Sequence, residues 1–226
     1  LVRPVHKRIS EIASVRPNAR PTLVEVGRKG ALVRLPDVSD RPLLFEMVIV
    51  SAGHVGNTRG LHLEKTQAKV DASEFVIVDP STLRTNDPRI FAAGDVVGGE
   101  LLADKAIAHG RIAAEIIAGR SSVFDARAIP SAIFTDPQLA WVGLLEDSAK
   151  TQATSCAVLR MPWGASGRAV GMGRGGDGMT KIVYEPESQL VLGVGIVGPH
   201  ACEMIGEAAL AIEMGATLTD LAATLH

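Results

Sequence analysis

The stretch TNDPRIFAAGDVVGGELLADKAIAHGRIAAEIIAG, residues 85–119, decides the fold of this chain. Residues 89–93, which are apolar after Arg89, lie between Asp87-Pro88 and Gly94, a pattern that predicts a buried strand. A helix is predicted after it, because apolar residues recur every three or four positions and Gly119 provides a stop. The predicted apolar stripe consists of Ala103, Ala106, Ile107, Gly110, Ala113, Ala114 and Ile117.

The turn between this strand and helix contains Asp95, followed by Gly98-Gly99. In open α/β sheets, ligands bind beyond the carboxyl ends of strands, where helix N-termini direct their free amides. A carboxylate there accepts hydrogen bonds from ligand hydroxyls, and the positive helix end favours an electron-rich ring. A flavin offers both groups. The alternative is a Gly-Asp turn that only ends the strand and leaves its carboxylate in solvent.

Several motifs follow one another along nearly the whole chain: AGHVGNT at residues 52–58, LLADKA at 101–106, IPSAIFTDPQLAWVGLLE at 129–146, PWGASGRA at 162–169 and VGIVGPHACEMIGEAALAIEMGAT at 194–217. Together with residues 85–95, this ordered series resembles the pyridine nucleotide-disulfide oxidoreductases, and within that group the dihydrolipoyl dehydrogenases. The resemblance covers only the later part of such a protein. It implies a C-terminal fragment.

The fold implied by this resemblance is α/β plus α+β. Residues 1–53 are expected to form the tail of an NAD-binding domain, 54–122 the C-terminal half of an FAD-binding domain, and 123–226 an α+β interface domain. Periodicity and turn residues agree with a helix in 1–15 and 201–214, a further helix near Glu146 and a capping box at Thr217–Asp220. Strands are predicted at 22–26, 31–35, 43–50, 74–79, 128–134, 139–144, 155–161, 179–184 and 190–197.

The resemblance also implies cofactor contacts. Asp95 would bind the ribityl hydroxyls of FAD, and Leu101, Leu102, Ala103 and Asp104 the isoalloxazine, mostly through backbone amides. Gly53 matches a position where the backbone approaches NAD, although it also reads as a strand-ending glycine.

Two positions depart from the family pattern. The family usually has Met-Leu-Ala-His where this chain has LLAD. Because a carboxylate near the pyrimidine edge would disfavour the anionic reduced flavin, the side chain of Asp104 should point away from the flavin. The usual Arg-x-Pro after Gly53 is replaced by His54-Val55-Gly56, which puts the local NAD contact in doubt.

The implied activity is oxidation of dihydrolipoamide through a redox disulfide and FAD, with hydride transfer to NAD. The implied partners are a second subunit in a homodimer and a 2-oxo acid dehydrogenase complex component that carries dihydrolipoamide. A closely spaced redox cysteine pair is absent from this sequence, so the chain alone is expected to be inactive. The alternatives are another flavin disulfide reductase, of the mercuric or glutathione reductase type, and a non-catalytic dimerisation module.

Composition argues against nucleic-acid binding and against a membrane span. The chain has 226 residues and a net charge of -2, with no basic run that would favour nucleic acid. Its most apolar run, residues 43–52, is too short for a membrane span. Cys156 and Cys202 are far apart, which fits packing roles and a reducing, cytoplasmic compartment.

Some sequence patterns match nucleotide-binding or catalytic motifs by letter but lack the neighbouring elements or residues that those motifs need. The glycine series at 171–176 and 193–198 match the dinucleotide fingerprint by letter. The first is followed by Asp-Gly and a strand where the fingerprint needs a helix. In the second, the apolar strand continues through the glycines, and the helix after it leads to another capping box instead of a strand with a ribose-binding acid. Close sheet packing is expected at 193–198. His226 matches the first histidine of the family's final Thr-x-His-x-His-Pro motif, whereas the acid/base catalyst is the second, so no catalytic or metal-binding residue is assigned.

Overall fold

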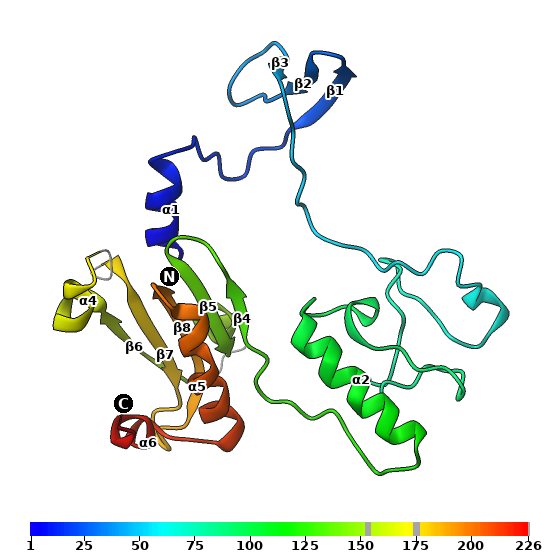
Figure 1. Ribbon diagram of the computed structural model, residues 1–226, viewed down its shortest axis with the longest axis vertical. Coiled ribbons are helices and arrows are strands. Elements are labelled where there is room, and N and C mark those ends of the chain that lie inside the picture. Colours follow the sequence, from blue (N-terminus) through cyan, green and yellow to red (C-terminus); the bar gives the residue numbers. More distant parts are fainter. Residues whose placement is uncertain (152–154, 174–176, 226) are drawn as a thin grey trace. The chain divides into compact units, whose positions relative to one another are not determined.

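A computed structural model describes residues 1–151, 155–173 and 177–225, and Figure 1 shows its elements. The chain divides into two compact units, one of Ile9–His54 and one of Leu1–Arg8 with Val55–His226. Helix α1, Val2–Ser10, runs across the boundary between these units and is shorter than the predicted helix at 1–15. Mixed helices and antiparallel sheets follow, in agreement with the expected fold class.

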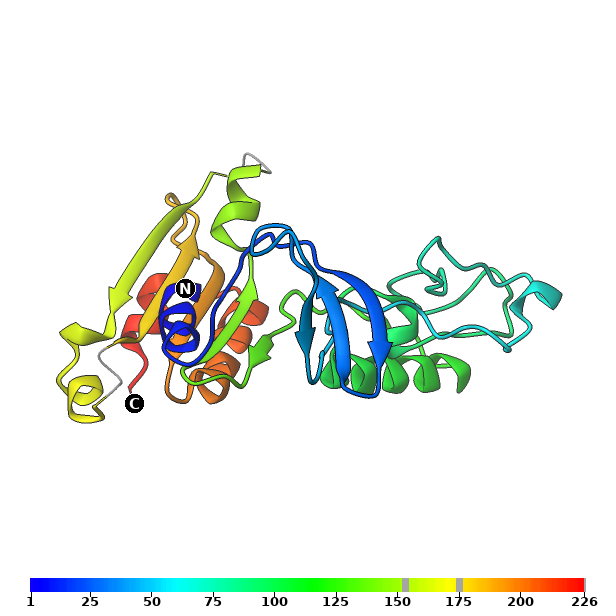
Figure 2. The same cartoon turned by 90° about the horizontal axis from the view of Figure 1, so that it is seen from above.

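The unit Ile9–His54 contains a three-stranded antiparallel sheet in the order β1-β2-β3, seen side by side in Figure 2 (blue). Strands β1, Thr22–Gly27, and β2, Gly30–Arg34, form the predicted hairpin. The turn needs a glycine, because Gly30 has a φ of 130° and a Cβ there would lie 2.1 Å from the carbonyl oxygen of Phe45. Strand β3, Leu43–Phe45, pairs with β2.

The predicted buried strand at residues 43–50 is wrong beyond Phe45. Met47, Ile49 and Val50 lie in an unpaired segment, and 85% of Ile49 is exposed. An apolar run forms a buried strand only when neighbouring strands and covering layers exist on both sides. Among the described residues, no strand pairs with this segment and no layer covers it.

The predicted strands at 74–79 and 89–93 are also wrong. Each is reduced to one isolated bridge, Val70 with Val76 and Arg84 with Phe91. Aspartate side chains organise this segment as successive turns instead, as at Asp79, whose carboxylate accepts hydrogen bonds from the amides of Ser81 and Thr82. A hydrogen bond from the Ser81 hydroxyl first, and then the bonds from the amides of Thr82 and Ser81, lower the pKa of Asp79.

Helix α2, Ala103–Ile117, has the predicted bounds but buries a different face. Its buried residues are Lys105, His109, Ile112, Ala113 and Ile116. The predicted stripe is largely exposed, with 72% of Ile107 and 66% of Ile117 accessible. Apolar residues line both faces of this helix, so periodicity alone could not choose between them. The buried face packs against Leu83, Phe91 and Phe124.

The C-terminal part of the chain, residues 123–225, contains a five-stranded antiparallel sheet with the order β4-β5-β8-β7-β6. All five strands expected here, the helix near Glu146 and the helix at 201–214 are present within a few residues of their expected positions. The elements are β4 Ser131–Ile133, β5 Gln138–Gly143, α3 Glu146–Thr151, β6 Ala157–Pro162, α4 Gly167–Gly171, β7 Met179–Tyr184, β8 Val191–Gly198, α5 Ala201–Met214 and α6 Leu218–Ala223, with a short 3₁₀ turn at Trp163–Ala165. Another 3₁₀ turn, Leu63–Lys65, lies earlier in the chain.

Helix α5 lies on one face of this sheet and contacts β5 and β8 (Figure 1). Ile205 and Ala208 of α5 pack on Val142, Val194 and Ile196 to make the largest core. Helix α6 begins with the predicted capping box, in which Thr217 and Asp220 bond reciprocally. The sequence therefore specifies this part of the chain almost completely.

A charged cluster at the start of α3 allows a prediction about stability. The Glu146 carboxylate accepts hydrogen bonds from Lys181 at 2.8 Å and Arg160 at 2.7 Å, and pairs with Lys150 at 3.1 Å. Hydrogen bonds from Lys181 first, then from Lys150 and Arg160, lower the pKa of Glu146 from 4.5 to about 2. A carboxyl with a depressed folded pKa stabilises the fold above its unfolded pKa and loses this contribution as pH falls.

We therefore expect Glu146→Gln to lower the free energy of unfolding at neutral pH by about 2 kcal/mol, a figure discounted for solvent screening. Urea unfolding of both proteins between about pH 7 and about pH 2 measures this difference. The difference should shrink as pH falls from 4.5 to about 2, the range set by the shifted pKa. An Asp147→Asn control should change little, because the Asp147 side chain is fully exposed. A constant difference at every pH would contradict the assignment.

Candidate functional site

A tight turn precedes helix α2 and packs against it. Residues Gly94–Val97 form a 3₁₀ turn, η2, and both Gly94 and Gly98 have positive φ. A Cβ on Gly94 would lie 2.9 Å from the Cβ of Ala106, so glycine lets the turn approach the second turn of α2. This close contact fixes η2 beside the start of the helix.

Asp95 lies on η2, not at the end of a buried strand as predicted. Its side chain is exposed, and within the described part of the chain its carboxylate has no hydrogen bond or ion pair. The backbone carbonyl of Asp95 accepts the amide of Gly98 at 3.0 Å, which closes the turn. The turn therefore presents an acceptor-only group that could bind a ligand hydroxyl.

The N-terminus of α2 supplies donors near this acceptor. The N-cap residue Leu102 makes no side-chain cap hydrogen bond, and the amides of Ala103 and Asp104 bond to no described group. Leu101 and Leu102 are half-buried, whereas Ala103 and Asp104 are exposed. Free amides at a helix N-terminus carry partial positive charge and attract electron-rich groups.

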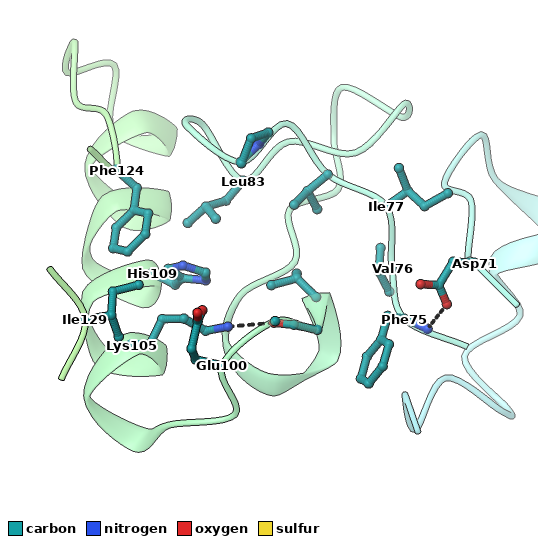
Figure 3. A pocket seen from close by; sticks show the side chains of 15 residues that line it. Asp71, Phe75, Val76, Ile77, Leu83, Glu100, Lys105, His109, Phe124 and Ile129 are labelled. Atoms are coloured by element: carbon teal, nitrogen blue, oxygen red, sulfur yellow. Dashed lines mark hydrogen bonds between the residues drawn. The ribbon is translucent and has the colours of Figure 1, made fainter. Parts of the chain in front are cut away.

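Two polar side chains of α2 join this turn to the helix, and sequence reasoning missed both. The Lys105 ammonium donates to the carbonyl of Gly98 at 2.6 Å, and Nδ1 of His109 accepts the amide of Gly94 at 3.3 Å. Figure 3 shows both side chains on the inner side of α2, below Phe124. Their positions in the stripe that continues through Ile112 and Ile116 could have identified them as buried.

A cavity of about 390 Å³ lies on this inner side (Figure 3). Its walls include Val97–Glu100, Lys105, His109, Phe75 and Phe124. Asp95 and residues 101–104 do not line it. The structure therefore brings five of the six candidate contact residues together on the turn and the helix start, outside this cavity.

The sixth candidate residue, Gly53, belongs to the other compact unit. It is exposed with a φ of 102°, a conformation that favours glycine, and a Cβ there would meet nothing within 4 Å. No neighbour in the described chain requires a glycine at this position. The positive φ is therefore the reason that glycine is favoured at position 53.

The patterns judged to be decoys have different outcomes. Residues 193–198 lie within β8, where a Cβ on Gly193 would be 2.0 Å from the carbonyl oxygen of Leu144, so the expected close packing is confirmed. The series at 171–176 includes residues 174–176, which are outside the described residues, as is His226. Cys156 and Cys202 are free and half-buried rather than fully buried.

The described residues contain neither a metal-binding cluster nor a membrane-spanning helix. No group of three or more His, Cys, Asp or Glu side chains could hold a metal ion. No helix among these residues is long and apolar enough to cross a membrane.

Comparison with known proteins identifies two matching families. Residues 10–110 match the profile of the pyridine nucleotide-disulphide oxidoreductases, and residues 129–226 match the dimerisation domain of the same proteins. Dihydrolipoyl dehydrogenase of Vibrio cholerae is 39% identical over the full length of this chain, which covers 48% of that protein. The enzyme of the same name from Thermus scotoductus is 42% identical over 83% of this chain and 40% of its own length. The chain thus spans about half the length of these relatives.

Solved structures agree with this match. LpdA from Mycobacterium tuberculosis superposes with a TM-score of 0.85 at 29% identity, over 98% of this chain and 48% of its own. The flavoprotein disulfide reductase RclA from Escherichia coli, with a TM-score of 0.88 at 22% identity over the whole chain and 51% of its own, supports the fold alone. The two profiles cover most of the sequence in the expected order, and therefore this chain belongs to the pyridine nucleotide-disulphide oxidoreductase family.

Proposed function

We propose that this chain is the C-terminal part of an FAD-dependent dihydrolipoyl dehydrogenase, which oxidises dihydrolipoamide through a redox disulfide and FAD and passes a hydride to NAD. Relatives with this name that align with the whole chain, and are about twice its length, support the proposal. In this proposal residues 1–53 end the NAD-binding domain, 54–122 end the FAD-binding domain, and 123–226 form the interface domain.

One observation carries the flavin part of this proposal. The unpartnered carboxylate of Asp95 and the free amides of Ala103 and Asp104 stand on two elements that pack directly against each other. A polyhydroxyl ribityl chain needs the acceptor, and the electron-rich pyrimidine edge of the ring needs the donors. The residues present therefore fit FAD in their chemistry.

Each residue has a distinct role in this assignment. Asp95 would orient the ribityl chain, and the backbone of 101–104 would bind the ring edge while Leu101 and Leu102 exclude water from it. The bound flavin would supply the electron-transfer chemistry, and this chain would supply binding and electrostatics. Asp104 is exposed on the first helical turn, where its charge complements the helix dipole. Gly53 would let the backbone approach NAD.

The proposed partners are a second subunit and a lipoamide-bearing component of a 2-oxo acid dehydrogenase complex, in the cytoplasm. The dimerisation-domain match at residues 129–226 supports the homodimer. Helix α5 also exposes Met204, Leu210 and Met214, apolar side chains that a subunit contact could cover. Catalysis needs the redox cysteines and the catalytic histidine, which this sequence does not supply.

The decisive experiment uses the complete protein that contains this chain, with this chain alone as the control. We expect the complete protein to have a visible flavin spectrum, the mass of a dimer in light scattering, and dihydrolipoamide-dependent formation of NADH, whereas the chain alone should form none. A flavin spectrum without lipoamide activity would instead indicate another disulfide reductase. Absence of flavin would indicate a dimerisation module and overturn the proposal.

A further inference from the structure

We propose that Lys105 and His109 are positioning residues, which hold the two ends of the Gly94–Gly98 turn against α2 and so set the position of Asp95. This inference rests on the proposed flavin site, since the position of Asp95 has a purpose only if a ligand binds it. It adds residues that bind no ligand themselves and act through the backbone of the turn.

Lys105 fixes the second end of the turn. Only 6% of Lys105 is exposed, and its ammonium donates to the carbonyl of Gly98 at 2.6 Å (Figure 3). A buried ammonium is costly unless it is hydrogen-bonded, and a hydrogen bond from a charged donor is stronger than one between neutral groups. Removing this side chain would leave the carbonyl without its donor. Both the burial and the charge of Lys105 therefore strengthen its hydrogen bond to the turn.

His109 fixes the first end of the turn, one helical turn further along the same face of α2. Only 5% of His109 is exposed, and Nδ1 accepts the amide of Gly94 at 3.3 Å. The imidazole packs edge-on against the ring of Phe124, with 4.4 Å between the ring centroids. The amide of Phe124 in turn donates to Ser81 at 2.8 Å, so the ring that supports His109 is itself anchored.

The two bonds act on opposite ends of one short segment. Asp95 follows Gly94 directly, and its side chain has no support from any described group, so its direction depends on the backbone of the turn. Release of either end would let the carboxylate move relative to the amides at the start of α2. Catalytic and binding groups need such positioning to within fractions of an ångström.

The bond made by His109 depends on pH, because a protonated Nδ1 cannot accept a hydrogen bond. The other charged side chains around the same cavity are Lys105 from α2, Glu100 from the preceding loop and Asp71 from an earlier turn. Burial, and secondly the charge of Lys105, lower the pKa of His109 below its ordinary value of 6.5. The bond to Gly94 is therefore intact near neutral pH and is lost only in acid.

The test measures FAD binding to the flavin-free complete protein by fluorescence titration, at about pH 7.5 and about pH 5. We expect His109→Ala and Lys105→Met to raise the Kd about tenfold at neutral pH, the effect of one lost hydrogen bond to a buried or charged group. His109→Gln can still accept from Gly94 through its amide oxygen, so it should bind nearly as well as the wild type. Arg111→Gln, exposed on another face of α2, is the matched control and should change nothing.

The pH comparison separates positioning from general stability. Acid should weaken binding more in the wild type than in His109→Gln, because only the wild type has an imidazole to protonate at this position. Equal pH dependence in the two proteins, or an unchanged Kd in both His109→Ala and Lys105→Met, would overturn the inference. If His109→Ala unfolds, the comparison with His109→Gln still decides the question.

A second readout needs no flavin. Hydrogen exchange of the Gly94 amide, followed in the flavin-free complete protein, should be faster in His109→Ala than in His109→Gln and Arg111→Gln. Slow exchange in every variant would disprove the bond to His109 even if flavin binds normally. Conversely, a wild-type protein that binds no flavin at all would refute the proposed function, and the exchange measurement would still test the turn.

Discussion

Replacing Asp95 by alanine is expected to weaken binding of FAD on the order of 100-fold in the complete protein, the largest effect of any single change in the proposed site. A hydrogen bond to a charged group contributes about 1.5–3 kcal/mol, and the exposed carboxylate of Asp95 is free to accept from more than one ribityl hydroxyl. Fluorescence titration of the flavin-free protein gives the Kd. Asp95→Asn should lie between alanine and the wild type, because it keeps one acceptor oxygen without the charge.

Glu100→Gln is the matched control for this prediction. Glu100 is also an exposed acid, five residues along the same loop, and it lines the inner cavity rather than the face that bears Asp95. It should leave FAD binding within about twofold of the wild type, a difference below 0.5 kcal/mol. Equal losses at both positions would mean that general negative charge, and not the placement of Asp95, governs binding. A full flavin complement in Asp95→Ala would refute its role.

The second large effect concerns folding of the C-terminal part, residues 123–225. Gly193→Ala should lower its free energy of unfolding by about 3 kcal/mol, because the new methyl group would lie 2.0 Å from the carbonyl oxygen of Leu144 and the backbone there must shift. Gly193 also pairs with Gly143 at the end of the β5–β8 ladder, so the shift would disturb that register. Tryptophan fluorescence during urea unfolding reports the loss, since both tryptophans of the chain, Trp141 and Trp163, lie in this part.

Gly206→Ala provides the opposite control in the same domain. Gly206 lies inside α5, and a Cβ there would meet nothing within 4 Å. Alanine is favoured over glycine in a helix interior by about 1 kcal/mol, so this variant should be more stable than the wild type. A similar destabilisation in both variants would show that the domain resists any added methyl group, and would remove the specific argument for Gly193.

The sequence predicted different parts of this protein with different success, for physical reasons. In the C-terminal part, each strand pairs with neighbours within the chain, so alternation and turn residues located β4 to β8, and the 201–214 pattern gave α5 its bounds. At 43–50 and 89–93 the apolar runs were recognised, but pairing decides whether such a run becomes a strand. The described chain pairs only residues 43–45 of the first run with β2, and gives the second run a single isolated bridge.

The sequence likewise predicted some features of the candidate site and not others. Its chemistry, an acid in a glycine-rich turn before a helix, can be read from residues 94–104, because turn geometry and free helix amides are local properties. The hydrogen bonds from Lys105 to Gly98 and from Gly94 to His109 could not be predicted from the sequence, because they depend on which face of α2 is buried.

By itself, therefore, the sequence determined the family, the positions of the strands in the C-terminal part and the position of the acidic turn along the chain. Only the tertiary structure decided which side of α2 faces inward, and with it the burial of a lysine and a histidine beneath that turn. The physical reason is that α2 is apolar on two faces, so its periodicity permits either orientation, and packing against Leu83, Phe91 and Phe124 selects one.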